Sequence, residues 1–145
     1  MKLTFKSSLN YLDVVHNFVN ELSILLKFEA QQKIRLSIAV SEAVTNAIIH
    51  GNKENQDGTI IVNVDIKPHQ LQIDVTDEGK NDFRYDPKRH GVLDENNVGM
   101  ETGRGIFIMR SYLDQLKFRR IKNSGTCVSL IKYLDKEGSV CGHQN

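Results

Sequence analysis

The segment from Leu36 to His50 (LSIAVSEAVTNAIIH) constrains the fold most, because Glu42 is its only residue with a formal charge. Charged residues make up 26% of the whole chain, so a helix lying open on the surface would carry several of them here. At about 100° per residue, the apolar side chains of this segment gather on one broad side, which predicts an amphipathic helix with a buried face. The predicted core face consists of Leu36, Val40, Ala43, Val44, Ala47 and Ile48.

The opposite side of this helix is predicted to carry a polar row of Glu42, Asn46 and His50, each four residues after the last. Ile38 and Ile49 flank the row. A lone carboxylate one turn before a carboxamide, between apolar residues, suits a polar site that faces a cleft better than a solvated face. The alternative is structural: Glu42 and Asn46 would then satisfy buried backbone groups or cap a neighbouring element.

Three segments have helical spacing of apolar residues. The first helix is predicted over residues 10–28, with Asn10 as its N-cap. The second is expected from about Glu29 to His50, where Gly51-Asn52 ends it. The third is expected to start at 103–105 and to carry Ile106, Met109 and Leu113 on one face.

Strands are predicted where apolar and β-branched residues alternate with polar ones. They lie near residues 3–5, 59–66, 70–76, 116–121 and 126–133. The order of elements predicts an α+β fold, a two-layer α/β sandwich with a mixed, mainly antiparallel sheet and three helices on one face. Residues 1–134 are expected to form this single domain, and residues 135–145 a flexible C-terminal tail.

Composition and charge give no indication of several function classes. Lys and Arg number 19, and Asp and Glu 18, so a net charge of +1 gives no reason to expect binding to nucleic acid or to an anionic membrane. No apolar stretch approaches the ~20 residues of a membrane span, and the start of the chain lacks the apolar region of a signal peptide. Cys127 and Cys141 cannot build a disulfide framework and are expected to be reduced thiols. We therefore expect a cytoplasmic protein.

Short motifs lie at the ends of predicted elements. Asp77-Glu78-Gly79 follows a strand, where a carboxylate next to glycine can accept a hydrogen bond from a ligand amine. Gly103-Arg104-Gly105 runs into a helix, where backbone N–H groups, the helix dipole and the arginine can hold phosphate. Each also has a purely structural interpretation, the first as a strand-ending turn and the second as a flexible hinge. Gly125-Thr126, at the start of the last strand, is by itself a hairpin turn.

Taken in order, these segments resemble the Bergerat ATP-binding fold of the GHKL superfamily, to which gyrase, Hsp90, histidine kinases and MutL belong. Ser41–Asn52 (SEAVTNAIIHGN) is similar to the N box of that superfamily. Asp77-Glu78-Gly79 resembles its first glycine box, Gly103-Arg104-Gly105 its second, and Gly125-Thr126 its last conserved pair. The runs EAVTNAIIHGN, DEGKNDF and GRGIFIMRSYLDQ resemble the SpoIIAB/RsbW-like anti-sigma factor serine/threonine kinases, and the likeness covers about residues 30–134.

The resemblance implies a role for each candidate site residue. Glu42 would be the catalytic general base toward the attacking hydroxyl, or would orient it, and Asn46 would coordinate the Mg²⁺ that bridges the ATP phosphates. Asp77 would accept a hydrogen bond from the adenine amino group, with Gly79 making room and Thr126 nearby. Residues of about 80–102 would form the ATP lid. The other implied nucleotide-binding residues would lie near the phosphates, and they are His50, Lys53, Gly103, Arg104 and Gly105.

Two positions depart from the family pattern. Asn81 stands where the family often has a second glycine in the first box, and Arg104 stands where many relatives carry an apolar residue. Asn tolerates a positive φ better than most residues, so the turn at Asn81 is expected to survive.

The resemblance implies an ATP- and Mg²⁺-dependent serine/threonine protein kinase that acts as an anti-sigma regulatory factor. Its partners would be a sigma factor and a STAS-type anti-anti-sigma protein, which it would phosphorylate, and it would form a homodimer. The alternative is a non-catalytic module of the same fold in which ATP gates protein binding. The catalytic part of a histidine kinase is disfavoured, because this sequence has no dimerisation helix with a phosphoacceptor His.

Overall fold

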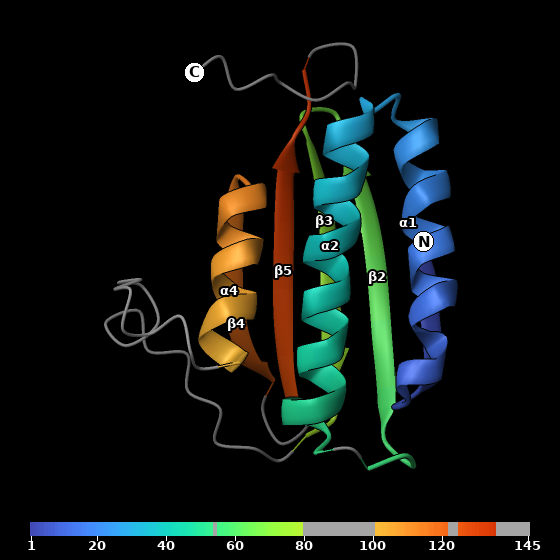
Figure 1. Cartoon of the computed structure of the whole chain (residues 1–145), viewed down its shortest axis with the longest axis vertical. Helices are drawn as coiled ribbons and strands as arrows, with labels where there is room; N and C mark the ends of the chain where they lie inside the picture. Colours follow the sequence, from blue (N-terminus) through green and yellow to red (C-terminus); the bar gives the residue numbers. More distant parts are fainter. Residues whose placement is uncertain (54, 80–100, 122–124, 136–145) are drawn as a thin grey trace.

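Figure 1 shows the fold as a computed structural model, which describes residues 1–53, 55–79, 101–121 and 125–135, with the backbone alone for 101–104. Five strands form one sheet in the order β1-β2-β3-β5-β4. Their bounds are β1 Lys2–Lys6, β2 Thr59–Lys67, β3 Gln70–Asp77, β4 Gln115–Ile121 and β5 Gly125–Tyr133. The predicted α+β class is confirmed.

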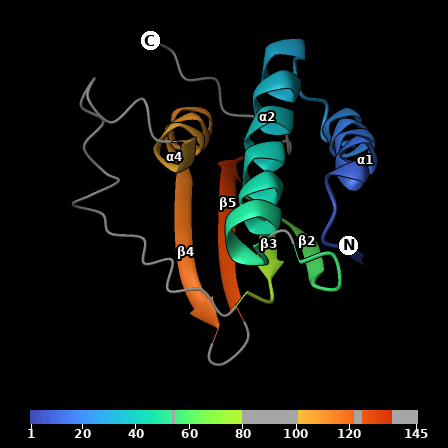
Figure 2. The same ribbon diagram turned by 60° about the horizontal axis from the view of Figure 1, so that its bottom comes forward.

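The helices lie together on one face of the sheet (Figures 1 and 2). They are α1 (Leu12–Leu25), α2 (Ala30–Asn46) and α4 (Glu101–Tyr112). A short 3-10 helix, η1 (Leu9–Tyr11), precedes α1, and a π-helical turn, η2 (Ala47–Gly51), continues α2. None of the helices in the described ranges is both long and apolar enough to cross a lipid bilayer.

The sheet is antiparallel at each of its four described pairings, so the expectation of a mixed sheet is corrected. Two of the connections, β2 to β3 and β4 to β5, join neighbouring strands directly, which makes them antiparallel. Between β1 and β2 the chain passes through α1 and α2, which run in opposite directions (Figure 1). A pair of opposed helices returns the chain to the end of the sheet it left, and the next strand therefore runs the other way.

The core lies between the helices and the inner face of the sheet. All six residues of the predicted core face, which α2 and η2 share, are buried, with at most 5% of each exposed. Alternate residues of the central strands face them, and Ile60, Val62, Leu71, Ile73 and Val75 are all completely or almost completely buried. On α4 the predicted face is confirmed as well, because Ile106, Met109 and Leu113 pack into the same core.

The starts of two helices differ from the predicted ones, whereas the end of the second helix agrees. Ser8, not Asn10, caps the first helical segment, since its hydroxyl accepts from the Asn10 N–H at 3.3 Å. The π-helical turn carries α2 on to Gly51, close to the predicted end. The backbone of α4 already begins at Glu101, so the Gly103-Arg104-Gly105 motif lies inside the helix instead of preceding it. Most of the implied lid, including Asn81, and the predicted tail from residue 136 lie outside the described residues.

Candidate active site

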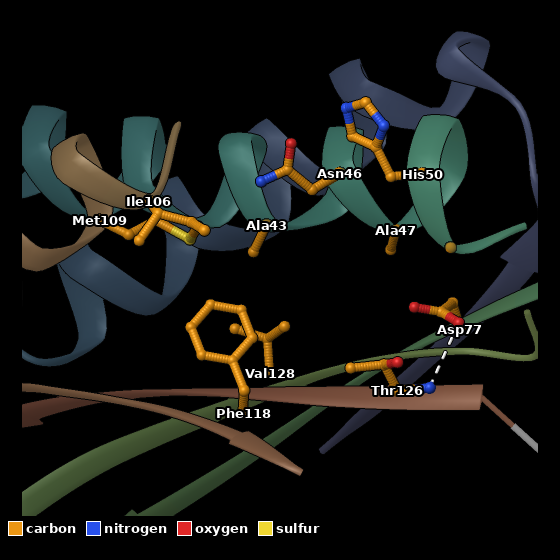
Figure 3. A pocket seen from close by; sticks show the side chains of 11 residues that line it. Ala43, Asn46, Ala47, His50, Asp77, Ile106, Met109, Phe118, Thr126 and Val128 are labelled. Carbon is orange, nitrogen blue, oxygen red and sulfur yellow. Dashed lines mark hydrogen bonds between the residues drawn. The ribbon is translucent and has the colours of Figure 1, made fainter. Parts of the chain in front are cut away.

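A pocket lies between α2, α4 and the sheet (Figure 3). Its lining comes from every layer of the domain, namely from α2 and η2, from α4 and from β3, β4 and β5. The lining residues are Ala43, Asn46, Ala47, His50, Gly51, Asp77, Ile106, Met109, Phe118, Thr126 and Val128.

The wall formed by α2 and η2 combines small and polar residues. Ala43 and Ala47 point toward the sheet, and their short side chains leave the space that forms the pocket (Figure 3). Asn46 and His50, one turn apart, project together from another side of the helix (Figure 3). The π-helical turn begins directly after Asn46, and such turns are frequent at functional sites.

Asp77 provides a buried carboxylate at the end of β3, with 5% of the residue exposed. Its Oδ1 accepts hydrogen bonds from the backbone N–H groups of Gly79, at 2.9 Å, and Thr126, at 3.3 Å (Figure 3). Burial raises the pKa of the Asp77 carboxyl, and these two hydrogen bonds act in the opposite direction. Within the described part of the chain, Oδ2 receives no hydrogen bond, which leaves it available to a donor in the pocket.

Glycines allow the backbone to approach Asp77 closely. A Cβ on Gly51 would lie 2.3 Å from the Asp77 Oδ2 atom, and one on Gly79 would overlap the Gly51 carbonyl. Gly125 has a φ of +113° and its Cβ position coincides with the Asp77 carbonyl. A side chain at any of these positions would displace the carboxylate or the backbone beside it.

Glu42 and Asn46 of α2 lie next to Gly105 of α4. A Cβ on Gly105 would come within 2.7 Å of Glu42 Oε2 and 3.3 Å of Asn46 Nδ2. Among the described residues, neither side chain makes a hydrogen bond or ion pair, so neither caps an element nor satisfies a backbone group there. The structural interpretation of this pair therefore finds no support in the described contacts, and both side chains are available to a ligand.

The structure places the other predicted site residues at three different locations. Thr126 and His50 line the pocket with Asn46 and Asp77. Gly79 and the exposed Lys53 line a neighbouring hollow on the far side of Gly51 instead. Gly103 and Arg104 lie in the first turn of α4, and their side chains lie outside the description.

Sequence reasoning missed the apolar end of the pocket. Phe118 of β4 and Val128 of β5 line it opposite Ile106 and Met109 (Figure 3). Alternation predicts the strands that carry Phe118 and Val128, but a core position and a pocket wall have the same pattern. An aromatic or aliphatic wall facing a single buried carboxylate suits a flat heterocycle that carries an amino group.

The residues present fit a magnesium ion held together with phosphates. No group of three or more His, Cys, Asp or Glu side chains suited to a metal occurs in the described ranges. Mg²⁺ commonly takes only one or two protein oxygens and completes its shell with water and substrate phosphates. The oxygens of Asn46 and Glu42, which have no partner within the described ranges, are ligands of the kind it prefers.

Comparison with known proteins indicates the family of this chain. A family model described as "Histidine kinase-like ATPase domain" matches residues 5–132. The anti-sigma F factor of Anoxybacillus flavithermus is 33% identical over 106 residues, 73% of each chain. That of Bacillus cytotoxicus is 30% identical over 111 residues, 77% of this chain and 76% of the relative.

A solved structure is similar in fold. The blue-light activated histidine kinase of Erythrobacter litoralis EL346 matches 84% of this chain with a TM-score of 0.55 and 18% identity. This chain spans 40% of the length of that kinase. The match over residues 5–132, together with the relatives, shows that the chain belongs to the histidine kinase-like ATPase domains of the GHKL superfamily, in the branch that resembles SpoIIAB.

Proposed function

We propose that this chain binds ATP with Mg²⁺ in the pocket and transfers the γ-phosphate to a serine or threonine of a STAS-type anti-anti-sigma protein. We further propose that it is an anti-sigma regulator that binds a sigma factor. The names of its relatives, which are anti-sigma F factors, support the second part. The family of ATPase domains to which it belongs supports the first.

The observation that carries the proposal is the Asp77 carboxylate at the end of the pocket. One of its oxygens is held by two backbone N–H groups, and the other has no described donor. The amino group of adenine is a donor of the right kind, and Thr126 stands beside it on β5. The apolar end, with Phe118 and Met109, would then pack against the purine ring.

The phosphates would extend toward α2, where Asn46 and His50 project. Asn46 would hold the magnesium ion, which when bound neutralises the charge of the phosphates during transfer. Glu42, one turn before Asn46, would accept the proton of the attacking hydroxyl or orient it. Gly105 lets α4 approach both side chains, so the first turn of α4 would be near the phosphates as well.

Radiolabelled ATP tests the transfer directly. The chain is incubated with γ-labelled ATP, Mg²⁺ and a STAS-type partner, and we expect the label on a serine or threonine of that partner. Replacing Glu42 by Ala should lower the transfer rate by about 10²-fold or more, because the group that takes the proton is lost. The affinity for a non-hydrolysable ATP analogue should be largely retained, since Glu42 does not line the base pocket.

A matched control is Glu21→Ala, which makes the same change on the exposed side of α1 and should leave transfer unchanged. Label on a histidine of this chain, or transfer that survives Glu42→Ala, would contradict the mechanism. ATP-dependent binding of the partner without any label would favour the non-catalytic, ATP-gated module.

A further inference from the structure

Asn52 is a buried polar residue that has no role in the site described so far. It is 7% exposed and follows the π-helical turn directly. Both ends of its carboxamide are used: Oδ1 accepts from the Glu78 N–H at 3.0 Å, and Nδ2 donates to the Thr59 carbonyl at 3.2 Å. Asn52 thereby connects the end of the α2–η2 helix to the start of β2 and to the end of β3.

Glu78 completes this connection. Its Oε2 accepts from the Thr59 N–H at 3.0 Å. The N–H of Thr59 is therefore bonded by the Glu78 side chain and its carbonyl by the Asn52 side chain. Gly58 leaves the necessary room, because a Cβ there would lie 2.8 Å from Asn52 Nδ2. We call this set of hydrogen bonds, between Asn52, Thr59 and Glu78, the Asn52 clamp.

The clamp lies beside the carboxylate that the proposed function uses for the base. Glu78 directly follows Asp77, and Gly79 donates its N–H to the Asp77 Oδ1 atom. Moving the Glu78 backbone would therefore move Asp77 relative to α2, which carries Asn46 and Glu42. A hydrogen bond weakens steeply once its angle falls below about 120°, so the alignment of Asp77 with α2 determines the fit of the base.

We propose that Asn52 is a positioning residue for nucleotide recognition: it fixes the Asp77–Gly79 turn against α2, so that the Asp77 carboxylate meets the amino group of the adenine. The inference rests on the proposed function and deepens it. It assigns to Asn52 an effect on selection of the base, separate from the transfer step at Glu42.

Two nucleotides distinguish this effect from a general structural one. The full chain is titrated with a non-hydrolysable ATP analogue and with the matching purine nucleotide that lacks the 6-amino group. In Asn52→Ala we expect affinity for the ATP analogue to fall about tenfold, while that for the second nucleotide changes by about twofold or less. Asn55→Ala is the matched control, because Asn55 is exposed and, among the described residues, its side chain bonds only the neighbouring Asp57 N–H, at 3.1 Å.

A ligand-free measurement tests the clamp itself. Amide hydrogen exchange at Glu78 should quicken about tenfold or more in Asn52→Ala, and exchange at Val44, inside α2, should not change. If Asn52→Ala does not fold, Glu78→Ala replaces it: this side chain is exposed, and its loss removes the bond to Thr59. The same selective loss for the ATP analogue is then expected.

Equal loss for both nucleotides, or no loss for either, would overturn the inference while leaving ATP binding by the wild-type chain intact. Unchanged exchange at Glu78 would overturn it as well. A wild-type chain that binds neither nucleotide would instead remove the proposed function, and the inference with it.

Discussion

Asp77 illustrates, at the scale of a single residue, how a binding site costs stability. A carboxylate that is 5% exposed has lost most of its hydration, and two backbone N–H groups replace that hydration on one oxygen. No cation among the described residues pairs with it. A residue that served stability alone would be an amide or an apolar side chain here, so the carboxylate is best explained by a ligand.

The burial of the Asp77 carboxylate predicts how the stability of the fold depends on pH. Burial raises the pKa of the Asp77 carboxyl above its ordinary value of 3.8, so the folded chain holds this proton more tightly than the unfolded chain. The stability gained in this way is complete below the ordinary value and is lost as the pH rises through the folded-state pKa. Asp77→Asn removes the charge, and the amide oxygen can still accept from Gly79 and Thr126.

We therefore expect Asp77→Asn, without nucleotide, to be more stable than the wild-type chain near neutral pH, with the difference shrinking as the pH falls. Urea unfolding midpoints measured between about pH 4 and pH 8 check this. The same variant should bind ATP more weakly, because the amide offers an N–H where the adenine amino group needs an acceptor. A stability difference that stays constant over this range would show that the charge of Asp77 is not its cause.

At the scale of elements, the end of α1 contains a residue in a conformation that favours glycine. Lys27 has a φ of 55°, and the N–H groups of Lys27 and Phe28 donate to the carbonyls of Ile24 and Ser23, at 3.0 and 2.9 Å. This is a Schellman motif, in which glycine is the usual residue at the left-handed position. Phe28 is buried after it and fixes the path of the chain into α2.

Lys27→Gly should therefore stabilise the fold by about 1 kcal/mol, since it removes the strain of a left-handed side chain. Chemical denaturation of both chains at one pH measures the change. Lys33→Gly serves as the control: it makes the same substitution inside α2 and should destabilise by about 1 kcal/mol. If both variants lose stability, the Lys27 side chain contributes contacts that outweigh the strain.

The elements themselves could be predicted from the sequence, whereas the starts of two helices and the fully antiparallel order of the sheet could not. Periodicity predicts α2 and β3 because one face of each is buried, and the spacing of apolar residues records that burial. The cap at Ser8 was missed, because Ser8 and Asn10 are both good N-caps and only the backbone conformation distinguishes them. The apolar wall at Phe118 depends on how α2 and α4 pack over the β4–β5 pair, which no local pattern specifies.

At the scale of the whole molecule, strand order brings the site together. β5 pairs with β3, so Thr126 lies against Asp77 although 49 positions separate them in the chain. α4 packs against α2 on the same face, and this brings Gly105 to Glu42. The candidate site therefore depends on two close contacts, one between helices and one between strands, and a glycine makes each of them possible.

Replacing either glycine by alanine is expected to have opposite effects on the stability of the fold. At Gly105 a methyl group would meet Glu42 Oε2 at 2.7 Å, the end of a side chain that can turn aside, and alanine favours a helix over glycine by about 1 kcal/mol. Gly105→Ala should thus keep or slightly raise stability but reduce phosphoryl transfer, because the Glu42 carboxylate is displaced.

At Gly125 a methyl group would meet the Asp77 backbone carbonyl, and the φ of +113° is one that alanine rarely adopts. Relieving either the clash or the unfavourable φ would require the β3–β5 pairing to open. Gly125→Ala should therefore lose roughly 2–4 kcal/mol of stability. Urea unfolding of both variants, alongside the transfer assay, separates the two cases. Comparable losses of stability at both positions would mean that the Glu42 side chain cannot turn aside from Gly105. The close contact between α2 and α4 would then serve the stability of the fold more than phosphoryl transfer.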